Sequence, residues 1–450
     1  LGVSCFYHNS AAALIRDGAI VAAAEEERFS RKKNDRRFPA GAINFCLEEG
    51  DIDVSRLNDV VYYDNSQLTF ERLLRSVAEA EEKGLDFWCR LLPSWLHYKL
   101  DFANMFKKRM LYDGRILQGR HHRSHAASAF YPSPFERAAI LTVDGVGEWA
   151  TATIGVGEGA QIRLLKEMHF PHSVGLLYSA FTQFTGFKAN SGEYKMMGLA
   201  PYGEPRYVQT ILEHLIDLKD DGSLELSTEY FEFLSERSMT NDRFASLFGG
   251  PARNPESRIT KREMDIARSI QFITEEVVLR MAHTAKRLTG ETRLCMAGGV
   301  ALNCVGNGRL LREGPFEEIW IQPAAGDAGA ALGAALDVYH TVHAKPRRNM
   351  KKGQSLQGAS LLGPEFHGDE IEAFLETYGY PYEKLELGTR ADRLASILAE
   401  GKVLGHFVGR SEFGPRALGA RSILGDPCDQ DMQVKLNLKI KYRESFRPFA

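Results

Sequence analysis

Two histidines four positions apart are the first residues of this 450-residue chain with a spacing that could serve chemistry. In the segment HHRSHAASAF, His121 and His125 would project from one face of a helix, where both imidazoles can bind a single metal ion. The same spacing also occurs in histidines that merely pack or face solvent, so the pair alone leaves both interpretations open. His122 would point away from that face and is expected to be a structural or supporting residue.

Two aspartates could complete such a site. Asp144 in VDGVGE and Asp327 in AAGDAGA each lie in a glycine-rich turn at the end of a strand-like run. Either one alone would be interpreted as a turn or helix-cap residue. Together with the histidines they form a set of two imidazoles and two carboxylates, which suits divalent iron, manganese or zinc and leaves room for ligand oxygens.

The elements that must position these residues form two comparable units. Each unit reads as strand, polar or glycine-rich turn, strand, turn and strand. The expected strands are 1–6, 11–16 and a run toward residue 25 in the first unit, and 138–143, 149–154 and 162–167 in the second. This recurrence favours a duplicated actin-like nucleotide-binding architecture in which both first turns face one cleft, although two unrelated hairpins would give the same pattern.

Two further runs combine a strand with a glycine loop and a helix. After an expected helix over 262–288, strands at 293–296 and 318–322 run into AGGVALN and PAAGDAGAALGAAL. Backbone N–H groups at the starts of such helices bind phosphate, so both loops are candidate nucleotide sites.

Composition bounds the remaining possibilities. The 56 basic and 59 acidic residues leave a net charge of −3, which argues against nucleic acid or an anionic membrane as a partner. The six cysteines are scattered, and no apolar stretch reaches the length of a membrane span, so a cytoplasmic protein is expected. The basic, polar segment 344–358 is the best linker candidate, and the run toward Ala450 has no terminating signal, so the chain is expected to continue.

Eight motifs in register resemble the nodulation and antibiotic O-carbamoyltransferases, a family that includes the tobramycin and cephamycin carbamoyltransferases. The motifs are GVSCFYHNSAAALI, EEERFSRKK, HHRSHAASAFYPSPFERAAILTVDGVGE, GEYKMMGLAPYG, AGGVALN, GDAGAALGAAL, EFGPRALGARSILGDP and KIKYRESFRPFA. The resemblance implies an α/β protein with a duplicated actin-like (ASKHA, RNase H-like) domain over 1–343, the linker, and a smaller YrdC-like α/β domain over 359–450 that is incomplete at its C-terminus.

The resemblance also implies an activity. In the family, the YrdC-like domain joins carbamoyl phosphate and ATP into carbamoyl-adenylate, and the actin-like domain transfers the carbamoyl group to an acceptor hydroxyl. The implied cofactors are ATP, with Mg²⁺, and a divalent metal, most simply iron. The implied partner is a small hydroxylated metabolite such as a sugar, secondary metabolite or antibiotic-like acceptor, with a homodimer as one possible assembly and no nucleic acid or membrane partner.

Residue by residue, the family's metal ligands fall on His121, His125, Asp144 and Asp327, and its general base falls on His8. The expected nucleotide-site residues are Glu193, Lys195, Gly198, Gly298, Gly299, Asn303 and Gly326. For Glu193 and Lys195 a surface ion pair is an equal alternative. The basic residues expected around carbamoyl phosphate are Arg416, Arg421, Lys441, Arg443 and Arg447, for which a solvated helix face is the alternative.

Three other functions are weighed against carbamoyl transfer. A small-molecule kinase of the actin-like superfamily would explain the glycine loops but not the histidine and aspartate set. A catalytically silent homologue would not need His8 beside a complete set of metal ligands. Threonylcarbamoylation of tRNA would call for a basic stripe that the chain lacks. The sequence carries no signal that identifies the acceptor or the metal.

Overall fold

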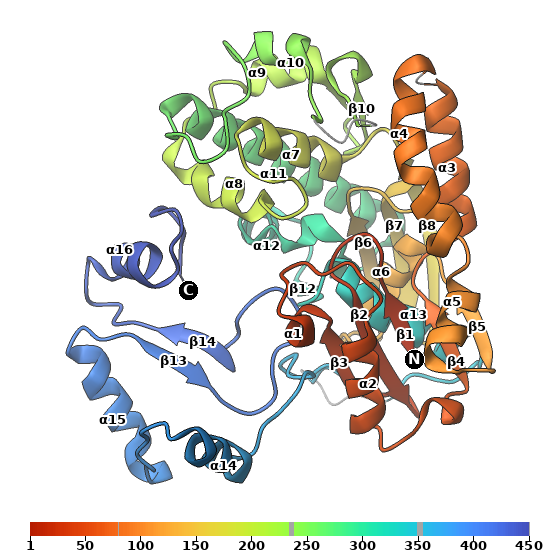
Figure 1. Ribbon diagram of the computed structural model, residues 1–450. Coiled ribbons are helices and arrows are strands. Elements are labelled where there is room, and N and C mark those ends of the chain that lie inside the picture. The colour runs from red at the N-terminus through yellow and green to blue at the C-terminus, as the bar shows by residue number, and fades with distance from the viewer. Residues whose placement is uncertain (80, 234–237, 349–353, 450) are drawn as a thin grey trace. The chain divides into compact units, whose positions relative to one another are not determined.

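The computed structural model describes residues 1–79, 81–233, 238–348 and 354–449. The chain divides into two compact units, Leu1–Gln357 and Gly358–Ala450, which are described separately. Figure 1 shows the first unit as two β-sheets with helices packed around them, and the second as a smaller set of helices and a hairpin.

The first sheet of unit 1 has the order β3-β2-β1-β4-β5. Strands β1, β2 and β3 form an antiparallel meander, and β4 and β5 extend the sheet in parallel with β1. The bounds are β1 Gly2–Ser4, β2 Ala11–Arg16, β3 Ala19–Glu25, β4 Asp59–Tyr62 and β5 Arg115–Gln118. The turn that carries His8 joins β1 to β2.

The second sheet has the order β12-β11-β6-β7-β8 and the same topology. Strands β6, β7 and β8 form the meander, and β11 and β12 are parallel to β6. The bounds are β6 Arg137–Val143, β7 Ala150–Glu158, β8 Gln161–His169, β11 Arg293–Ala297 and β12 Glu318–Ile321. The turn that carries Asp144 joins β6 to β7 and is the counterpart of the His8 turn, so the duplicated actin-like architecture predicted from the sequence is confirmed.

Two helices connect the sheets. Helix α6 (His121–Phe130) packs against β6 and β11, α13 (Asp327–Thr341) packs against β1 and β2, and the two helices pack against each other. Their contact is close because a Cβ atom at Gly333 would lie 1.8 Å from the carbonyl oxygen of Ser124. A Cβ at Gly2 of β1 would likewise lie 1.9 Å from the carbonyl oxygen of Ala331. The small residues of GDAGAALGAAL therefore permit approaches that a larger side chain would block.

The other helices of unit 1 cover the two sheets (Figure 1). Their bounds are α1 Glu27–Ser30, α2 Ala40–Glu49, α3 Ser66–Glu79, α4 Glu81–Ser94, α5 Phe102–Met110, α7 Val174–Phe184, α8 Glu193–Leu199, α9 Val208–Thr210, α10 Asp242–Leu247, α11 Lys261–Thr289 and α12 Cys304–Glu313. A short hairpin, β9 Ile216–Leu218 and β10 Leu224–Leu226, completes the unit. In the part of the chain that the structure describes, none of the helices combines the length and hydropathy that crossing a bilayer requires.

Unit 2 is a small α/β unit. Its strands pair in an antiparallel hairpin. The elements are α14 Gly368–Tyr378, α15 Leu387–Ala399, β13 Leu404–Phe407, β14 Arg421–Leu424 and α16 Met432–Lys435.

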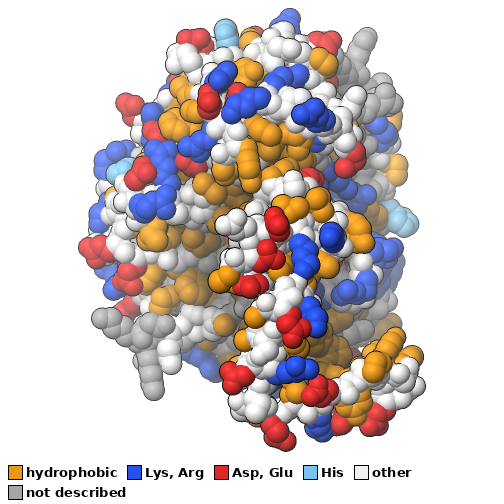
Figure 2. Space-filling view, turned by 90° about the vertical axis from the view of Figure 1, so that its left-hand side faces the viewer, with side chains coloured by type: hydrophobic (Ala, Val, Ile, Leu, Met, Phe, Trp, Pro, Cys, Tyr) orange, Lys and Arg blue, Asp and Glu red, His pale blue; other side chains and the backbone are white. Residues whose placement is uncertain are grey.

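Acidic and basic side chains are intermixed on the face of the molecule shown in Figure 2, as expected from the balanced composition.

Residues 344–348 and 354–357 of the expected linker 344–358 belong to unit 1, and Gly358 begins unit 2. The guanidinium of Arg347 donates hydrogen bonds of 2.7–3.1 Å to four carbonyl oxygens and lies over the Phe130 ring. Those carbonyls belong to residues 130, 131, 133 and 135, at and after the C-terminal end of α6, where a cation is stabilising. Gln357 is buried and donates to Gln322. This segment therefore holds the helix that carries both histidines.

We predict that Arg347→Ala lowers the free energy of unfolding by about 2–4 kcal/mol, because four carbonyl oxygens lose a charged donor. The matched control is Arg348→Ala, which removes one hydrogen bond from an exposed arginine to the carbonyl of Asp17. Urea denaturation followed by circular dichroism would measure both. Equal stability of the two variants would show that Arg347 does not anchor the segment.

Candidate metal centre

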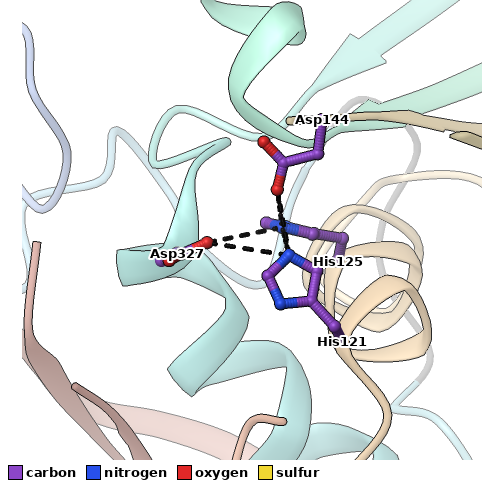
Figure 3. A group of neighbouring side chains, drawn as sticks. All are labelled: His121, His125, Asp144 and Asp327. Carbon is purple, nitrogen blue, oxygen red and sulfur yellow. Dashed lines mark hydrogen bonds and ion pairs between the residues drawn. The ribbon is translucent and has the colours of Figure 1, made fainter. Parts of the chain in front are cut away.

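Four side chains from three separate elements converge in unit 1 (Figure 3). His121 and His125 lie on α6, Asp144 lies in the turn after β6, and Asp327 is the first residue of α13. One ligand atom of each residue lies within 4.8 Å of those of the others. The Nε2 atoms of the two histidines are 3.1 Å apart, at 2.9 and 3.0 Å from Asp144 Oδ2, and each is 3.8 Å from Asp327 Oδ1. The structure thus brings together the four residues predicted as metal ligands.

The cluster is buried and electron-rich. All four side chains are largely shielded from solvent, so two carboxylates face two imidazoles in a medium of low dielectric. Burial lowers the pKa of His121, but its hydrogen bond to Asp144 and the charges of Asp327 and Asp144 outweigh burial and raise the pKa to about 10. The environment therefore favours positive charge at this point. Imidazole nitrogens and carboxylate oxygens in this number fit a divalent transition metal, so the residues present fit the metal that the sequence predicts.

Two residues that the sequence did not nominate hold the ligands in place. Glu148 Oε1 accepts hydrogen bonds from the backbone N–H of His121 at 2.9 Å and of Asn65 at 3.1 Å. It thereby acts as a distant cap at the N-terminus of α6, whose own N-cap residue provides no side-chain cap. Tyr63 donates its hydroxyl to Asp327 Oδ2 at 3.1 Å. Glu148 belongs to the VDGVGE motif, which was a signal that could have been used, whereas Tyr63 lies after β4 in a segment without a motif.

Asp144 also joins the cluster to a glycine loop. Its Oδ1 atom accepts from the backbone N–H of Gly299 at 3.0 Å, while Oδ2 faces the histidines. Gly298 has a φ of 93°, and a Cβ there would lie 2.3 Å from the carbonyl oxygen of Val143, so only glycine fits. The Gly298 N–H donates to the carbonyl of Ala325, beside Gly326, which is the N-cap of α13. Gly298, Gly299 and Gly326 thus lie next to the ligands.

The other residues predicted for the nucleotide site make contacts within the protein. Asn303 exchanges two hydrogen bonds with Gln271 and caps α12 by accepting from the Gly306 N–H. Glu193 accepts from the hydroxyl of Ser179 and from the N–H of Asn190, both at 2.7 Å.

The GEYKMMGLAPYG motif lies mainly in α8. The Lys195 ammonium lies 5.8 Å from the centroid of the Phe187 ring, and Gly198 is buried in the helix. For Glu193, Lys195, Gly198 and Asn303 a role toward nucleotide stays a prediction.

His8 lies beside the cluster and reaches solvent. Its Nδ1 atom is 3.9 Å from Asp327 Oδ2, and its side chain is 37% exposed. An imidazole that is both accessible and adjacent to the ligands can accept a proton from a molecule that binds there.

The basic residues of unit 2 differ in their surroundings. Arg421 donates to four carbonyl oxygens and stacks on Phe407, 3.6 Å from the ring centroid. Its guanidinium therefore stabilises the hairpin of β13 and β14. Arg443 donates to Asn437 Oδ1 at 2.6 Å, and Arg447 is buried, 3.5 Å from Glu444. Arg416 and Lys441 are exposed.

Comparison with known proteins adds a family. Residues 1–336 match the model described as the carbamoyltransferase N-terminus, and residues 395–450 match the carbamoyltransferase C-terminus. The chain is 53% identical to an uncharacterized protein of Synechocystis over all of this chain and 74% of that protein. It is 36% identical to nodulation protein NolNO of Sinorhizobium fredii over 99% of this chain and 62% of that protein.

A third relative is named for an activity. The 3'-hydroxymethylcephem-O-carbamoyltransferase of Amycolatopsis lactamdurans is 26% identical over 75% of this chain and 59% of that protein. The chain thus spans about three quarters of the Synechocystis protein and less than two thirds of the other two. Among solved structures, component A of (R)-2-hydroxyglutaryl-CoA dehydratase from Acidaminococcus fermentans is 14% identical over 76% of this chain and 98% of that chain, with a TM-score of 0.39.

We predict that the purified protein binds one divalent transition-metal ion per chain, and that His125→Ala and Asp144→Ala each abolish this binding. The matched control is His122→Gln. The His122 ring packs beside those of His121 and His125, but its Nδ1 atom bonds Thr142 Oγ1 at 2.7 Å and the ring is not one of the four grouped ligands, so this variant should retain the ion. Plasma mass spectrometry of the gel-filtered variants, with circular dichroism to verify folding, measures the metal content. Loss of the ion in His122→Gln alone would contradict the assignment.

Proposed function

The chain belongs to the carbamoyltransferase family, and we propose that it transfers a carbamoyl group from carbamoyl-adenylate to a hydroxyl of a small metabolite. The observation that carries the proposal is the position of the solvent-accessible His8 beside the buried cluster of His121, His125, Asp144 and Asp327. A metal-binding cluster with an adjacent accessible base can serve acyl transfer to a hydroxyl, and the glycine loop joined to Asp144 supports the binding of a nucleotide beside the cluster.

The carbamoyl carbon is a poor electrophile, and a metal ion held by the cluster would make it more reactive. The chemistry that a divalent cation, such as iron, supplies when held by these four residues is positive charge beside the carbamoyl carbonyl or the adenylate phosphate. Tyr63 fixes the orientation of Asp327, and Glu148 fixes the start of α6, which carries His121. These metal ligands therefore need not reorganise when substrate binds.

His8 would act on the acceptor. As the acceptor oxygen forms its bond to the carbamoyl carbon, the bond from that carbon to the adenylate oxygen breaks and AMP leaves. The hydroxyl proton passes to the imidazole of His8, which is exposed enough to meet an incoming molecule and close enough to Asp327 for the resulting charge to be stabilised.

Glycine would allow the nucleotide to approach the cluster. Gly298 and Gly299 lack side chains where the loop meets Val143 and Asp144, and Gly326 is the N-cap of α13, whose first residue is Asp327. Asn303 would orient Gln271 through their paired amides, and Glu193 would fix the loop before α8. Lys195 and Gly198 stay nucleotide-site candidates on the resemblance.

The activation step is proposed for unit 2, from the resemblance to YrdC-like domains. Carbamoyl phosphate, water and ATP, with Mg²⁺, would yield carbamoyl-adenylate, phosphate and pyrophosphate. Water would cleave carbamoyl phosphate to carbamate and phosphate, and a carbamate oxygen would then displace pyrophosphate from the α-phosphorus of ATP. Arg416, Lys441, Arg443 and Arg447 are the proposed cations around the phosphoryl groups. The contacts of Arg421 support a structural role for that residue instead.

We predict that the full-length protein, given ATP and a divalent metal, releases pyrophosphate only when carbamoyl phosphate is present, and that His8→Ala retains this release. Transfer of [14C]carbamoyl to an acceptor should fall by about 10²–10⁴-fold in His8→Ala, because the general base is lost. The control His283→Ala changes an exposed histidine on α11 and should behave as wild type. Pyrophosphate release that is independent of carbamoyl phosphate would contradict the proposed activity.

A further inference from the structure

Asn437 is a fully buried polar residue of unit 2, with 0% of its surface exposed. It lies in a single turn of π-helix, Leu436–Ile440, that follows α16. Such turns are uncommon and often lie at functional sites. A buried amide is stable when its donors and its acceptor are paired within the protein. The partners of Asn437 therefore show which part of unit 2 this residue organises.

The side chain of Asn437 binds one loop at three points. Its Nδ2 group donates to the carbonyl oxygens of Ser445 at 3.1 Å and Arg447 at 2.8 Å. Its Oδ1 atom accepts from Arg443 Nε at 2.6 Å. The two carbonyl groups thus orient the amide so that its oxygen faces the guanidinium, and the loop 441–447 folds around the amide.

The backbone of this loop is strained immediately before Arg443. Tyr442 has a φ of 47°, in the left-handed region that residues with a Cβ atom seldom adopt. The residue is 85% exposed, so burial of its ring does not impose this conformation. The Arg443 N–H donates to the carbonyl of Asn437 at 3.0 Å, which adds a second bond between the two residues and holds the turn. Strain that neighbouring contacts maintain is typical of functional loops.

These contacts set the direction of the Arg443 guanidinium. Its Nε–H is bound by Asn437 Oδ1, and its Cζ atom lies 4.7 Å from the centroid of the Phe449 ring. The first contact fixes one edge of the planar group and the second fixes one face. Because arginine binds phosphate oxygens through its planar fork, the direction of the fork decides whether the cation can meet a phosphoryl group.

We propose that Asn437 is a positioning residue for carbamoyl phosphate, which directs the Arg443 guanidinium toward the phosphoryl group. This inference rests on the proposed function, in which Arg443 is one of the cations around carbamoyl phosphate. A neutral amide suits the task because it binds the Nε–H and the loop carbonyls together. It also adds no negative charge that would compete with the phosphate for the guanidinium.

Steady-state release of pyrophosphate by the full-length protein, with ATP, Mg²⁺ and varied carbamoyl phosphate, tests the proposal. Asn437→Ala should raise the KM for carbamoyl phosphate about 10–100-fold with little change in kcat, because the charged donor is no longer directed. The KM for ATP should be unchanged. The matched control is Lys439→Ala, which changes an exposed residue of the same helical turn and should leave both KM values unchanged.

A double-mutant cycle separates positioning of Arg443 from general support of the fold. Arg443→Ala alone should raise the KM for carbamoyl phosphate, and adding Asn437→Ala should raise it little further, because the group through which Asn437 acts is already lost. A wild-type KM in either single variant, an equal rise in the KM for ATP, or single effects that multiply in the double variant would overturn the proposal.

Nuclear magnetic resonance of the arginine side chains needs neither turnover nor a change at Asn437, so it decides if Asn437→Ala fails to fold. In full-length protein with isotopically labelled arginine, the Arg443 Nε–H signal is assigned by its loss in Arg443→Lys. It should exchange slowly with water and shift when carbamoyl phosphate is added. Fast exchange, or no shift at millimolar carbamoyl phosphate, would overturn the proposal. A slowly exchanging signal that shifts in a protein without pyrophosphate release would support the positioning role and refute the proposed activation step alone.

Discussion

The close approach of α6 and α13 is the contact on which the site depends. The histidines lie on α6 and Asp327 begins α13, so the ligand atoms can meet only if the two helices cross at backbone distance. Gly333 makes this possible because any side chain there would enter the space of the Ser124 carbonyl. The sheets add to the constraint, since each helix packs on a different one of the two repeated sheets. The duplication thus sets the positions of His8 and Asp144 in equivalent turns of the two sheets.

Electrostatics explains why so many neighbours support the cluster. Two carboxylates buried beside two imidazoles carry a large desolvation cost, which hydrogen bonds and a bound cation can offset. Tyr63 and the Gly299 N–H each satisfy a second oxygen of a ligand aspartate, and Glu148 satisfies the first N–H of α6. Arg347 does the same for carbonyls at the far end of that helix. The helix is therefore fixed at both ends by residues distant in sequence.

Local pattern predicted the repeated strands and the four candidate ligands because each has a local signal. Alternation and Asp-Gly turns mark the strands, and the i, i+4 spacing marks the two histidines. Tyr63 had no such signal, since it meets Asp327 across 264 positions of the sequence. Sequence spacing also could not show that Asn303 pairs with Gln271, or that Arg421 is held by carbonyls. The low hydrophobicity of the segment 344–358 indicated a linker. It gave no sign of the four hydrogen bonds that Arg347 donates to carbonyl oxygens of unit 1.

X-ray absorption spectroscopy of the metal ion bound to the full-length protein tests the central claim most directly, because it reports the ligand atoms around the ion itself. The account predicts a first shell of nitrogen and oxygen atoms at about 2.0–2.2 Å, with the outer-shell scattering of two imidazole rings. A shell that contains sulfur, or one that lacks imidazole scattering, would contradict it and place the metal, and with it the proposed transfer site, elsewhere in the protein.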